Sequence, residues 1–442
     1  MPVRLLDSFV STDPLAHVFS DDAVLAAMLQ FETALARAAA HAGLIPATAA
    51  STIGEAAEAG TFDPPAIARD SWRSATLTVP LVDALRSRVG AIDTGAATYV
   101  HWGATSQDVV DTALVLCLKR AAAILEEDHS GLQRALGRLS EDHAGTMMLA
   151  RTLLQPATPI TFGLKAASWR AAVSRAGRRM LTSFDDAAVL QFGGSSGTLA
   201  VFGQHRGTVS ARLAHELGLR EPDAPWHAYR DRLAALVAAC GVYCGTLGKI
   251  AHDVALLMQA EVAEASATGG RSSAMPHKRN PSGCAVALAA ASRLPGLVAT
   301  VLGGMAHEHE RGVGGWIAEA STISAAVQAT GAALAALTTV IGSLDVDAER
   351  MRTNISNTRG VIHAERAMML LAPILGREAA SRVIDDAIET ARHERGSFRD
   401  ALMSHADVAN ALTPAQVTEL DSYEPSIAAA EHFRRRQLLN ER

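Results

Sequence analysis

The chain is poor in aromatic residues and carries no excess of positive charge. Phe, Trp and Tyr together make up 4% of its 442 residues, whereas Ala and Leu dominate, a composition that favours helix. Lys and Arg number 40 against 46 Asp and Glu, which gives a formal net charge of −6. This balance does not indicate a nucleic-acid partner or an anionic membrane. Positive charge aimed at an anionic substrate therefore has to be local.

Cysteine is also scarce, and the four thiols show neither a CxxC motif nor a Cys/His metal spacing. We expect reduced, buried thiols in a cytoplasmic protein and neither a metal nor an organic cofactor. The N-terminal run MPVRLLDSFVSTDP lacks the apolar core of a signal peptide. The Gly-rich run QFGGSSGTLAVFG fits no nucleotide-binding motif. The cysteines are Cys117, Cys240, Cys244 and Cys284.

Residues 321–344 contain no charged side chain, which raises the question of a membrane span. The segment consists mostly of Ala, Ser, Thr and Gly, however, with Gln328 inside it. Such a composition compares poorly with a Leu-rich membrane helix. A helix that is apolar on all sides can instead be buried inside a large helical protein, and this is the interpretation we favour.

Apolar residues recur at helical spacing along most of the chain, and we find no convincing strand hairpin and no fixed-period repeat. A chain of this length is expected to form two or three domains. We predict an all-α fold with three helical domains: 1–105, 106–344 with a bundle of long helices, and 345–442. Long Ala-rich helices with extensive apolar faces imply oligomerisation through the middle region.

The segment 269–281, GGRSSAMPHKRNP, concentrates polar chemistry between glycines and prolines, which favour a loop over a helix. Hydroxyls beside cations and backbone N–H groups suit one task above others. They can hold a polycarboxylate while a proton moves on or off the carbon next to a carboxyl group. A solvated basic loop is the alternative. The polar residues are Ser272, Ser273, His277, Lys278, Arg279 and Asn280.

This loop resembles the signature GSSxMPxKxNP of the fumarase/aspartase superfamily, with Arg271 in place of Gly. The run HWGATSQD at 101–108 resembles the superfamily's first loop, HxGxTSxD. There, Thr105, Ser106 and His101 are candidates to bind substrate carboxylates; a helix N-cap is the alternative role for this loop. The resemblance covers essentially the whole chain. It implies a homotetramer around a core of twenty helices, with active sites shared between subunits.

The run RTLLQP at 151–156 resembles the second loop, RTHxQP, but Leu153 replaces the histidine. The glutamate that pairs with this histidine in the hydrolytic-type lyases is Ala285 here. A strongly basic leaving group profits from a proton donor, whereas a carboxylate, with a pKa near 4, needs none. The joint loss of the pair therefore favours a reaction in which a carboxylate attacks or leaves, such as lactone formation or opening.

Two further clusters offer guanidinium groups, which are well matched to carboxylates. Trp226, His227 and Arg230 lie in the run PWHAYRDRL, and a surface ion-pair cluster is the alternative there. Arg311 lies in the run EHER, where the alternative is a solvated turn. Together with the three loops, these runs resemble the cycloisomerase branch of the superfamily, which serves bacterial degradation of aromatic compounds.

The resemblance assigns proton transfer to Ser272. Backbone N–H groups of the loop, Lys278 and Asn280 are expected to stabilise an enolate-like intermediate. Nearby cations must lower the pKa of the serine in this scheme. Alternatives remain: a lyase that expels a weakly basic group such as nitrite from a succinate, a sulfomuconate cycloisomerase, or a non-catalytic assembly. Leu153 counts against adenylosuccinate lyase. The full set predicted from the sequence is His101, Ser272, Lys278 and Asn280 as catalytic residues, with Thr105, Ser106, Gln155, Trp226, His227, Arg230, Ser273, Met275 and Arg311 as substrate-binding residues.

Overall fold

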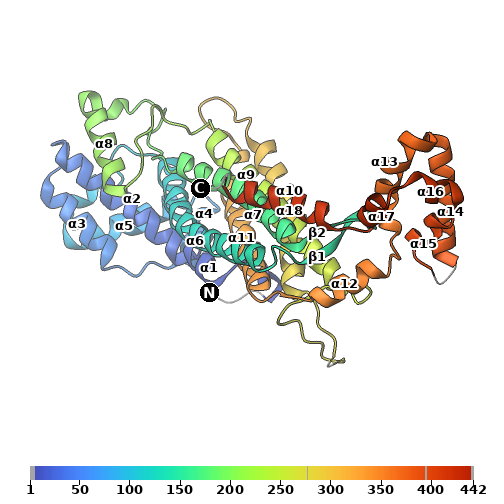
Figure 1. Cartoon of the computed structure of the whole chain (residues 1–442). Coiled ribbons are helices and arrows are strands. Elements are labelled where there is room, and N and C mark those ends of the chain that lie inside the picture. Colours follow the sequence, from blue (N-terminus) through green and yellow to red (C-terminus); the bar gives the residue numbers. More distant parts are fainter. Residues whose placement is uncertain (1–4, 276, 394–395, 440–442) are drawn as a thin grey trace. The chain divides into compact units, whose positions relative to one another are not determined.

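The computed structural model describes residues 5–275, 277–393 and 396–439, and nearly all of its regular structure is helical (Figure 1). The predicted all-α class is thereby confirmed. The chain divides into two compact units, which are described separately below. Unit 1 comprises Met1–Ser130, Arg175–Lys249 and Ala285–Leu337; unit 2 comprises Gly131–Ser174, Ile250–Cys284 and Thr338–Arg442. The predicted domain boundaries at 105 and 344 stay a prediction.

The N-terminal part of unit 1 is a cluster of short and medium helices. The helix α2 (Asp21–His41) packs against α3 and α8 through a face rich in Ala and Leu. The Ser20 hydroxyl caps it by accepting a hydrogen bond from the backbone N–H of Ala23 at 3.2 Å. The other elements are η1 (Leu5–Asp7), α1 (Asp13–Val18), α3 (Ala47–Glu58), α4 (Pro64–Ser71), α5 (Thr78–Ile92), η2 (Ala96–Tyr99), η3 (Ala200–His205) and α8 (Arg206–Leu217).

The long helices predicted for the middle of the chain are present, and the sequence of each one runs from one unit into the other. Their length follows from stretches rich in Ala and Leu, which are good helix formers. Glycines such as Gly245 and Gly331 also lie inside these helices, and Pro295 lies inside α10. The long helices are α6 (Ser106–Asp142), α7 (Phe162–Ala187), α9 (Asp231–Leu257), α10 (Ser282–Gly304) and α11 (Gly315–Gly342).

Four of the described helices, α2, α9, α10 and α11, are long and apolar enough to cross a membrane by length and composition. Their burial within the chain differs. In α11, which contains the charge-free segment, 61% of the most apolar window is buried, whereas in α10 only 22% is buried. The helix α10 therefore carries a large apolar surface that this chain alone does not cover.

The expectation that no strand hairpin exists is wrong. In unit 2, β1 (Met147–Thr152) pairs antiparallel with β2 (Gln155–Thr161). The connecting turn consists of Leu153 and Leu154, with φ angles of 50° and 64°. A two-residue turn with both φ angles positive is usually signalled by Asn-Gly or Asp-Gly, so a Leu-Leu turn gives the sequence no recognisable hairpin signal. A second short pair joins β3 (Ala265–Ser266) to β4 (Asp345–Val346).

The C-terminal helices of unit 2 share a hydrophobic core, the orange and red group in Figure 1. Leu371, Phe398 and Leu402 are completely buried there, and Ile384 nearly so. The helix α17 begins with a capping box between Thr413 and Gln416. The elements around this core are η4 (Val361–His363), α13 (Ala364–Leu375), α14 (Arg377–His393), α15 (Phe398–Met403), α16 (Ala406–Ala411) and α17 (Pro414–Leu420). Two further helices of unit 2, α12 (Ala348–Ser356) and α18 (Glu424–Leu439), contact β1 and β2 instead.

The start of α7 packs so closely on the end of α6 that only glycine fits at position 163. A Cβ on Gly163 would lie 2.7 Å from the carbonyl oxygen of Ser140 and 2.8 Å from that of His143. We predict that Gly163→Ala lowers the free energy of unfolding by about 1–3 kcal/mol, because the backbone has to move. Chemical denaturation monitored by circular dichroism measures this change.

The matched control is Gly145→Ala, where a Cβ would meet no atom within 4 Å. This control should change the free energy of unfolding by no more than about 0.5 kcal/mol. Equal effects of the two substitutions would contradict the packing described at Gly163.

Candidate functional site

The first predicted loop contains two residues in the left-handed backbone region. His101 has a φ of 61° and Gly103 a φ of 72°. Glycine is required at 103, because a Cβ there would lie 2.5 Å from the Phe202 ring. Left-handed backbone is costly for a residue with a Cβ, so His101 is held in this conformation by its surroundings.

Three segments that are distant in the sequence meet at Arg311. Its guanidinium donates hydrogen bonds to the hydroxyl of Thr105 at 2.7 Å and to the carbonyl oxygens of Gly194 and Ser195 at 2.6 and 3.0 Å. The structure thus brings the predicted residues Thr105 and Arg311 together, although 206 positions separate them. Ser106 begins α6 and is half-buried.

Asp108, in the first turn of α6, joins this loop to the Gly-rich segment. Its buried carboxylate accepts hydrogen bonds from the backbone N–H groups of Thr105, Gly193 and Gly194 at 2.9–3.0 Å and from Nε2 of His227 at 2.7 Å. A Cβ on Gly193 would lie 2.6 Å from the His227 ring. The glycines of the Gly-rich run therefore let its backbone N–H groups approach the Asp108 carboxylate. These N–H groups bind a side chain of the protein where a nucleotide-binding loop would bind a phosphate.

Asp111, one turn further along α6, lies at the centre of a second buried network. Its carboxylate accepts two hydrogen bonds from Arg230, at 2.7 and 3.0 Å, and one from the Trp316 indole at 2.9 Å. Gln107 and Gln191 donate to it at 3.1 and 3.2 Å. Bidentate contacts of this kind are among the strongest side-chain interactions.

The predicted residues Trp226, His227 and Arg230 are part of these networks and are all nearly inaccessible to solvent. The Arg230 guanidinium also donates to Glu319 at 2.9 Å and lies over the Trp226 ring at 4.8 Å. The alternative of an ion-pair cluster is present, but the cluster is buried. A direct contact of these three residues with substrate stays a prediction.

Burial and charge move the two acids of this cluster in opposite directions. Burial alone would raise the pKa of Asp111, but Arg230 and the other donors outweigh it and hold that pKa below its usual range. Burial raises the pKa of Glu319, with a smaller contribution from the charge of Asp111, and Arg230 compensates only in part. Asp111 is therefore the carboxylate that the cluster stabilises in its ionised form.

Asp111, Glu319 and Gln191 did not emerge from the motif comparison. Two acids three residues apart in the first turns of α6, followed by an uncharged run up to Leu118, are a signal that could have found Asp111. Nothing in the sequence near Glu319 or Gln191 marks either residue as a partner of Arg230.

The signature loop, in unit 2, is a tight turn whose ends are paired. The N–H of Asn280 donates to the carbonyl oxygen of Gly270 at 2.9 Å, and that of Lys278 donates to Met275 at 3.0 Å. Gly270 has a φ of 63°, and a Cβ there would lie 1.9 Å from the Asn280 carbonyl oxygen. The turn therefore requires glycine at position 270 for steric reasons, whereas the sequence alone would suggest only a flexible hinge.

Ser272 lies at the start of this turn and is half-buried. Its hydroxyl oxygen accepts a hydrogen bond from the N–H of Met275 at 3.0 Å. Ser273, Met275 and Lys278 are exposed, and Asn280 is half-buried just before α10 begins. Pro276 lies outside the described residues. The structure thus brings the five predicted residues of the signature loop together on one turn.

The second predicted loop is the hairpin of β1 and β2. Leu153 is 97% exposed at its turn, and Gln155 is exposed at the start of β2. Arg151 anchors the hairpin by a bidentate ion pair to the fully buried Glu264, at 2.8 and 2.6 Å. Glu264 in turn accepts a hydrogen bond from Asn354 at 2.8 Å. Arg151 thus has a structural partner that the motif did not indicate.

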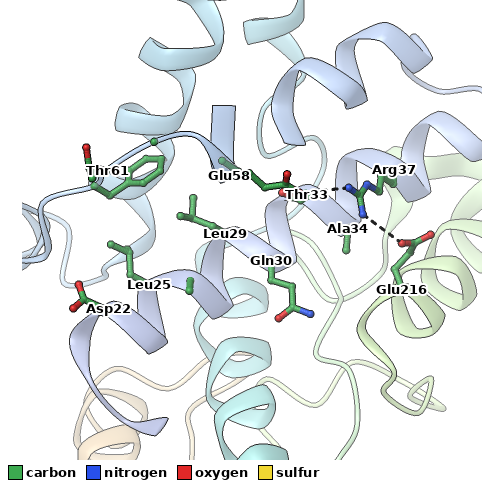
Figure 2. Close-up of a pocket in the computed structure, with 14 residues that line it drawn as sticks. Asp22, Leu25, Leu29, Gln30, Thr33, Ala34, Arg37, Glu58, Thr61 and Glu216 are labelled. Atoms are coloured by element: carbon green, nitrogen blue, oxygen red, sulfur yellow. Dashed lines mark ion pairs between the residues drawn. The ribbon is translucent and has the colours of Figure 1, made fainter. Parts of the chain in front are cut away.

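A cavity of about 570 Å³ lies elsewhere in unit 1, along α2, and Figure 2 shows the residues that line it. Arg37 is placed between Glu58 and Glu216, 3.9 Å from each, and Asp22 lines the same cavity. The lining carries more negative than positive charge and includes none of the predicted site residues. This cavity is therefore unsuited to a polycarboxylate.

Among the described residues, no group of three or more His, Cys, Asp and Glu side chains could hold a metal ion. All four cysteines are buried and unpaired by disulfides. Burial raises the pKa of Cys240 to about 12 and that of Cys244 and Cys284 to about 11, which leaves these thiols protonated at neutral pH.

Comparisons with known proteins show relatives of this chain. The sequence model of a family described as Lyase matches residues 8–296. The chain is 43% identical to 3-carboxy-cis,cis-muconate cycloisomerase of Bradyrhizobium diazoefficiens, over 95% of this chain and 94% of that protein. It is 39% identical to nitrosuccinate lyase of Streptomyces davaonensis, over 94% and 90% of the two chains.

The fold is similar to the crystal structure of the 3-carboxy-cis,cis-muconate lactonizing enzyme of Pseudomonas putida. The two structures superpose with a TM-score of 0.92 at 37% sequence identity. The match covers 99% of this chain and 98% of the other.

The two acids around Arg230 are expected to respond differently to neutralisation. Asp111→Asn should lower the free energy of unfolding by about 3 kcal/mol, because it removes the stabilised partner of a buried cation. Glu319→Gln should lower the free energy of unfolding by less than about 1.5 kcal/mol. The pKa of Glu319 is raised by burial, so the fold does not favour its ionised form. Urea denaturation at neutral pH measures both.

The pH dependence gives a second check on the same pair. The pKa of Asp111 is lower in the folded state than in the unfolded state, so the stability that Asp111 provides is fully present above the ordinary aspartate pKa. This stability is lost as pH falls through the folded-state value. The difference in stability between wild type and Asp111→Asn should therefore narrow in acid. A constant difference, or a larger cost for Glu319→Gln, would contradict the charge distribution described here.

Proposed function

This chain belongs to the lyase family of the fumarase/aspartase superfamily, and from that premise we propose that it converts 3-carboxy-cis,cis-muconate to 4-carboxymuconolactone. It acts in the degradation of aromatic compounds through the β-ketoadipate pathway. The observation that carries the proposal is the intact Ser272 loop in a chain whose general-acid pair is replaced by Leu153 and Ala285. The named relatives support the substrate.

The reaction is an internal addition that takes up one proton, which comes from solvent by way of Ser272, and it needs no other co-reactant. One carboxylate oxygen of the substrate bonds to a carbon of a double bond, and negative charge develops on the neighbouring carbon and its carboxyl group. A proton then adds to that carbon and the lactone is complete. The attacking group is already ionised at neutral pH, which is why a proton donor at position 153 can be absent.

Ser272 delivers the proton and regains one from solvent. The N–H of Met275 that donates to its oxygen stabilises the serine when it is deprotonated, because a hydrogen bond to the charged form favours that form. Lys278 and the amide of Asn280 stabilise the enolate-like intermediate. The N-terminal end of α10, two residues beyond Asn280, adds favourable polarity for negative charge.

The remaining predicted residues bind the carboxylates of the substrate. Arg311 and Thr105 already form one hydrogen-bonded unit, which offers a cation and a hydroxyl to a carboxylate. Ser106 and His101 lie in the same loop, and Gln155, Ser273 and Met275 complete the set on the hairpin and the signature loop. Trp226, His227 and Arg230 belong to the buried networks around Asp108 and Asp111. They are also proposed to contact substrate.

The protein is proposed to act in the cytoplasm as a homotetramer with active sites shared between subunits, without a nucleic-acid or membrane partner. The apolar and largely uncovered surface of α10 supports association between copies. The three-domain division at 105 and 344 would then assign the long-helix bundle to the contact between subunits. No cofactor is required by this chemistry.

A second function is kept because of one specific relative. Nitrosuccinate lyase shares 39% identity with this chain, and nitrite, like a carboxylate, is a weakly basic leaving group. The absence of the general-acid pair is equally compatible with that reaction. A sulfonated muconate is compatible with the cycloisomerase reaction as well. The substrate therefore has to be established by direct assay.

The assay is the ultraviolet absorbance of 3-carboxy-cis,cis-muconate with purified protein. Loss of the conjugated-diene band with formation of the lactone is expected. Fumarate formed from nitrosuccinate, with no change in the muconate, would overturn the proposal in favour of the lyase. A folded protein inert towards both substrates would instead favour a non-catalytic assembly.

Substitution of Ser272 tests the proposed mechanism. Ser272→Ala should lower kcat about 10²–10⁴-fold, because the proton donor of the reaction is lost. The control is Ser356→Ala, an exposed serine of α12 in the same unit, which should leave both kcat and the melting temperature unchanged. Near-full turnover by Ser272→Ala would exclude the proposed role of this serine.

A further inference from the structure

Helix α2 carries one buried acid within an otherwise uncharged and mostly apolar buried face. The side chain of Glu32 is 0% exposed, and its neighbours on the helix include Phe31, Met28 and Leu35, all buried. Burying a carboxylate costs free energy unless a charged or hydrogen-bonding partner compensates for it. The residue therefore needs an explanation beyond packing.

The partner of Glu32 is a predicted site residue. Its Oε1 lies 2.6 Å from Nδ1 of His101, whose side chain is 17% exposed. The other oxygen, Oε2, is buried and has no hydrogen-bond partner among the described residues. Within the described chain, Glu32 thus makes its side-chain hydrogen bond to the first loop alone.

The contact fixes which nitrogen of His101 carries a proton. An ionised carboxylate only accepts hydrogen bonds, so Nδ1 has to donate. Nε2 is then left without a partner in the described chain, and it is the nitrogen available to a ligand. His101 also has a left-handed backbone, with a φ of 61°, so the residue that makes this pairing is in a strained conformation.

The charges around His101 come from three elements. Glu32 on α2 and Asp108 on α6 favour the imidazolium, whereas Arg86 on α5 opposes it. Burial lowers the pKa of His101, but the attraction of Glu32 and its hydrogen bond outweigh burial, so the pKa is raised above its ordinary value. The imidazolium form consequently persists to higher pH than in a free histidine.

We propose that Glu32 is a positioning residue, which orients His101 through its Nδ1–H so that Nε2–H binds a substrate carboxylate. Glu32 itself does not touch the substrate. This inference rests on the proposed function, because it assigns His101 an anionic ligand. It adds a residue from a helix that no motif of the sequence marked.

The test begins with the wild-type protein and the variant His101→Gln, which identifies the His101 signals. Long-range ¹H–¹⁵N spectra recorded across a pH series report both the tautomer and the titration of the ring. We expect the neutral ring of His101 to carry its proton on Nδ1. A neutral ring with its proton on Nε2 would overturn the proposal, whatever substrate the protein uses.

The second arm uses Glu32→Gln, which keeps the shape and removes the charge. His101 should titrate at lower pH than in wild type, because burial is no longer opposed by Glu32. For the muconate, kcat/KM should fall about 10- to 100-fold at neutral pH through misplacement of the ring, with KM the more affected parameter. The alkaline limb of its pH profile should move to lower pH.

The control is Glu58→Gln at the end of α3, which removes the same charge from a side chain that is 77% exposed. It should change neither the His101 titration nor kcat/KM. An unchanged titration of His101 in Glu32→Gln would refute the positioning role. If wild type failed to convert the muconate, the proposed function would fail while the tautomer and titration still decided the role of Glu32.

Discussion

Two carboxylates at the start of α6 organise the predicted site region of unit 1. Asp108 and Asp111 are one turn apart, both buried, and each accepts hydrogen bonds from several segments. A buried anion must be compensated, so the first loop, the Gly-rich run and the segments around 227 and 316 are all drawn to them. The loops of this region have their positions because two charges need partners.

The signature loop in unit 2 is held by a different constraint. Its ends are joined through the backbone of Gly270 and Asn280, in a contact too close for any side chain at position 270. Steric exclusion restricts the backbone of the signature loop, whereas hydrogen bonds to buried carboxylates position the loops at the start of α6. In both cases the side chains proposed to meet substrate are carried on backbone that is held by hydrogen bonds or close packing, which suits a preorganised site.

Much of this architecture could be predicted from the sequence, because it depends on local pattern. Apolar spacing gave the long helices, and Gly and Pro marked the signature loop. The β1–β2 hairpin was missed because its turn uses Leu153 and Leu154 in a conformation that normally calls for Asn or Gly. Arg151 in β1 also makes a tertiary contact, the ion pair with Glu264, which the local sequence pattern does not indicate.

The contacts around the candidate site could be predicted only in part, and the roles of its residues stay predictions. Thr105 and Arg311 were both predicted, and they form a hydrogen bond in the structure. The sequence does not indicate Glu32 or Glu319, because each contacts a predicted residue 69 or 89 positions away. The spacing of residues along a helix can be read from one sequence. The distant side chain that a buried charge will contact cannot.

The left-handed backbone of His101 and Gly103 has a consequence for the energetics of ligand binding. A loop that had to adopt these φ values on contact with substrate would lose conformational entropy at that moment. Here the unfavourable conformation is already imposed when the chain folds, and folding bears the ordering cost once. Under the proposed function, each encounter with substrate begins from an ordered loop, so more of the contact energy remains as net affinity or as stabilisation of the transition state.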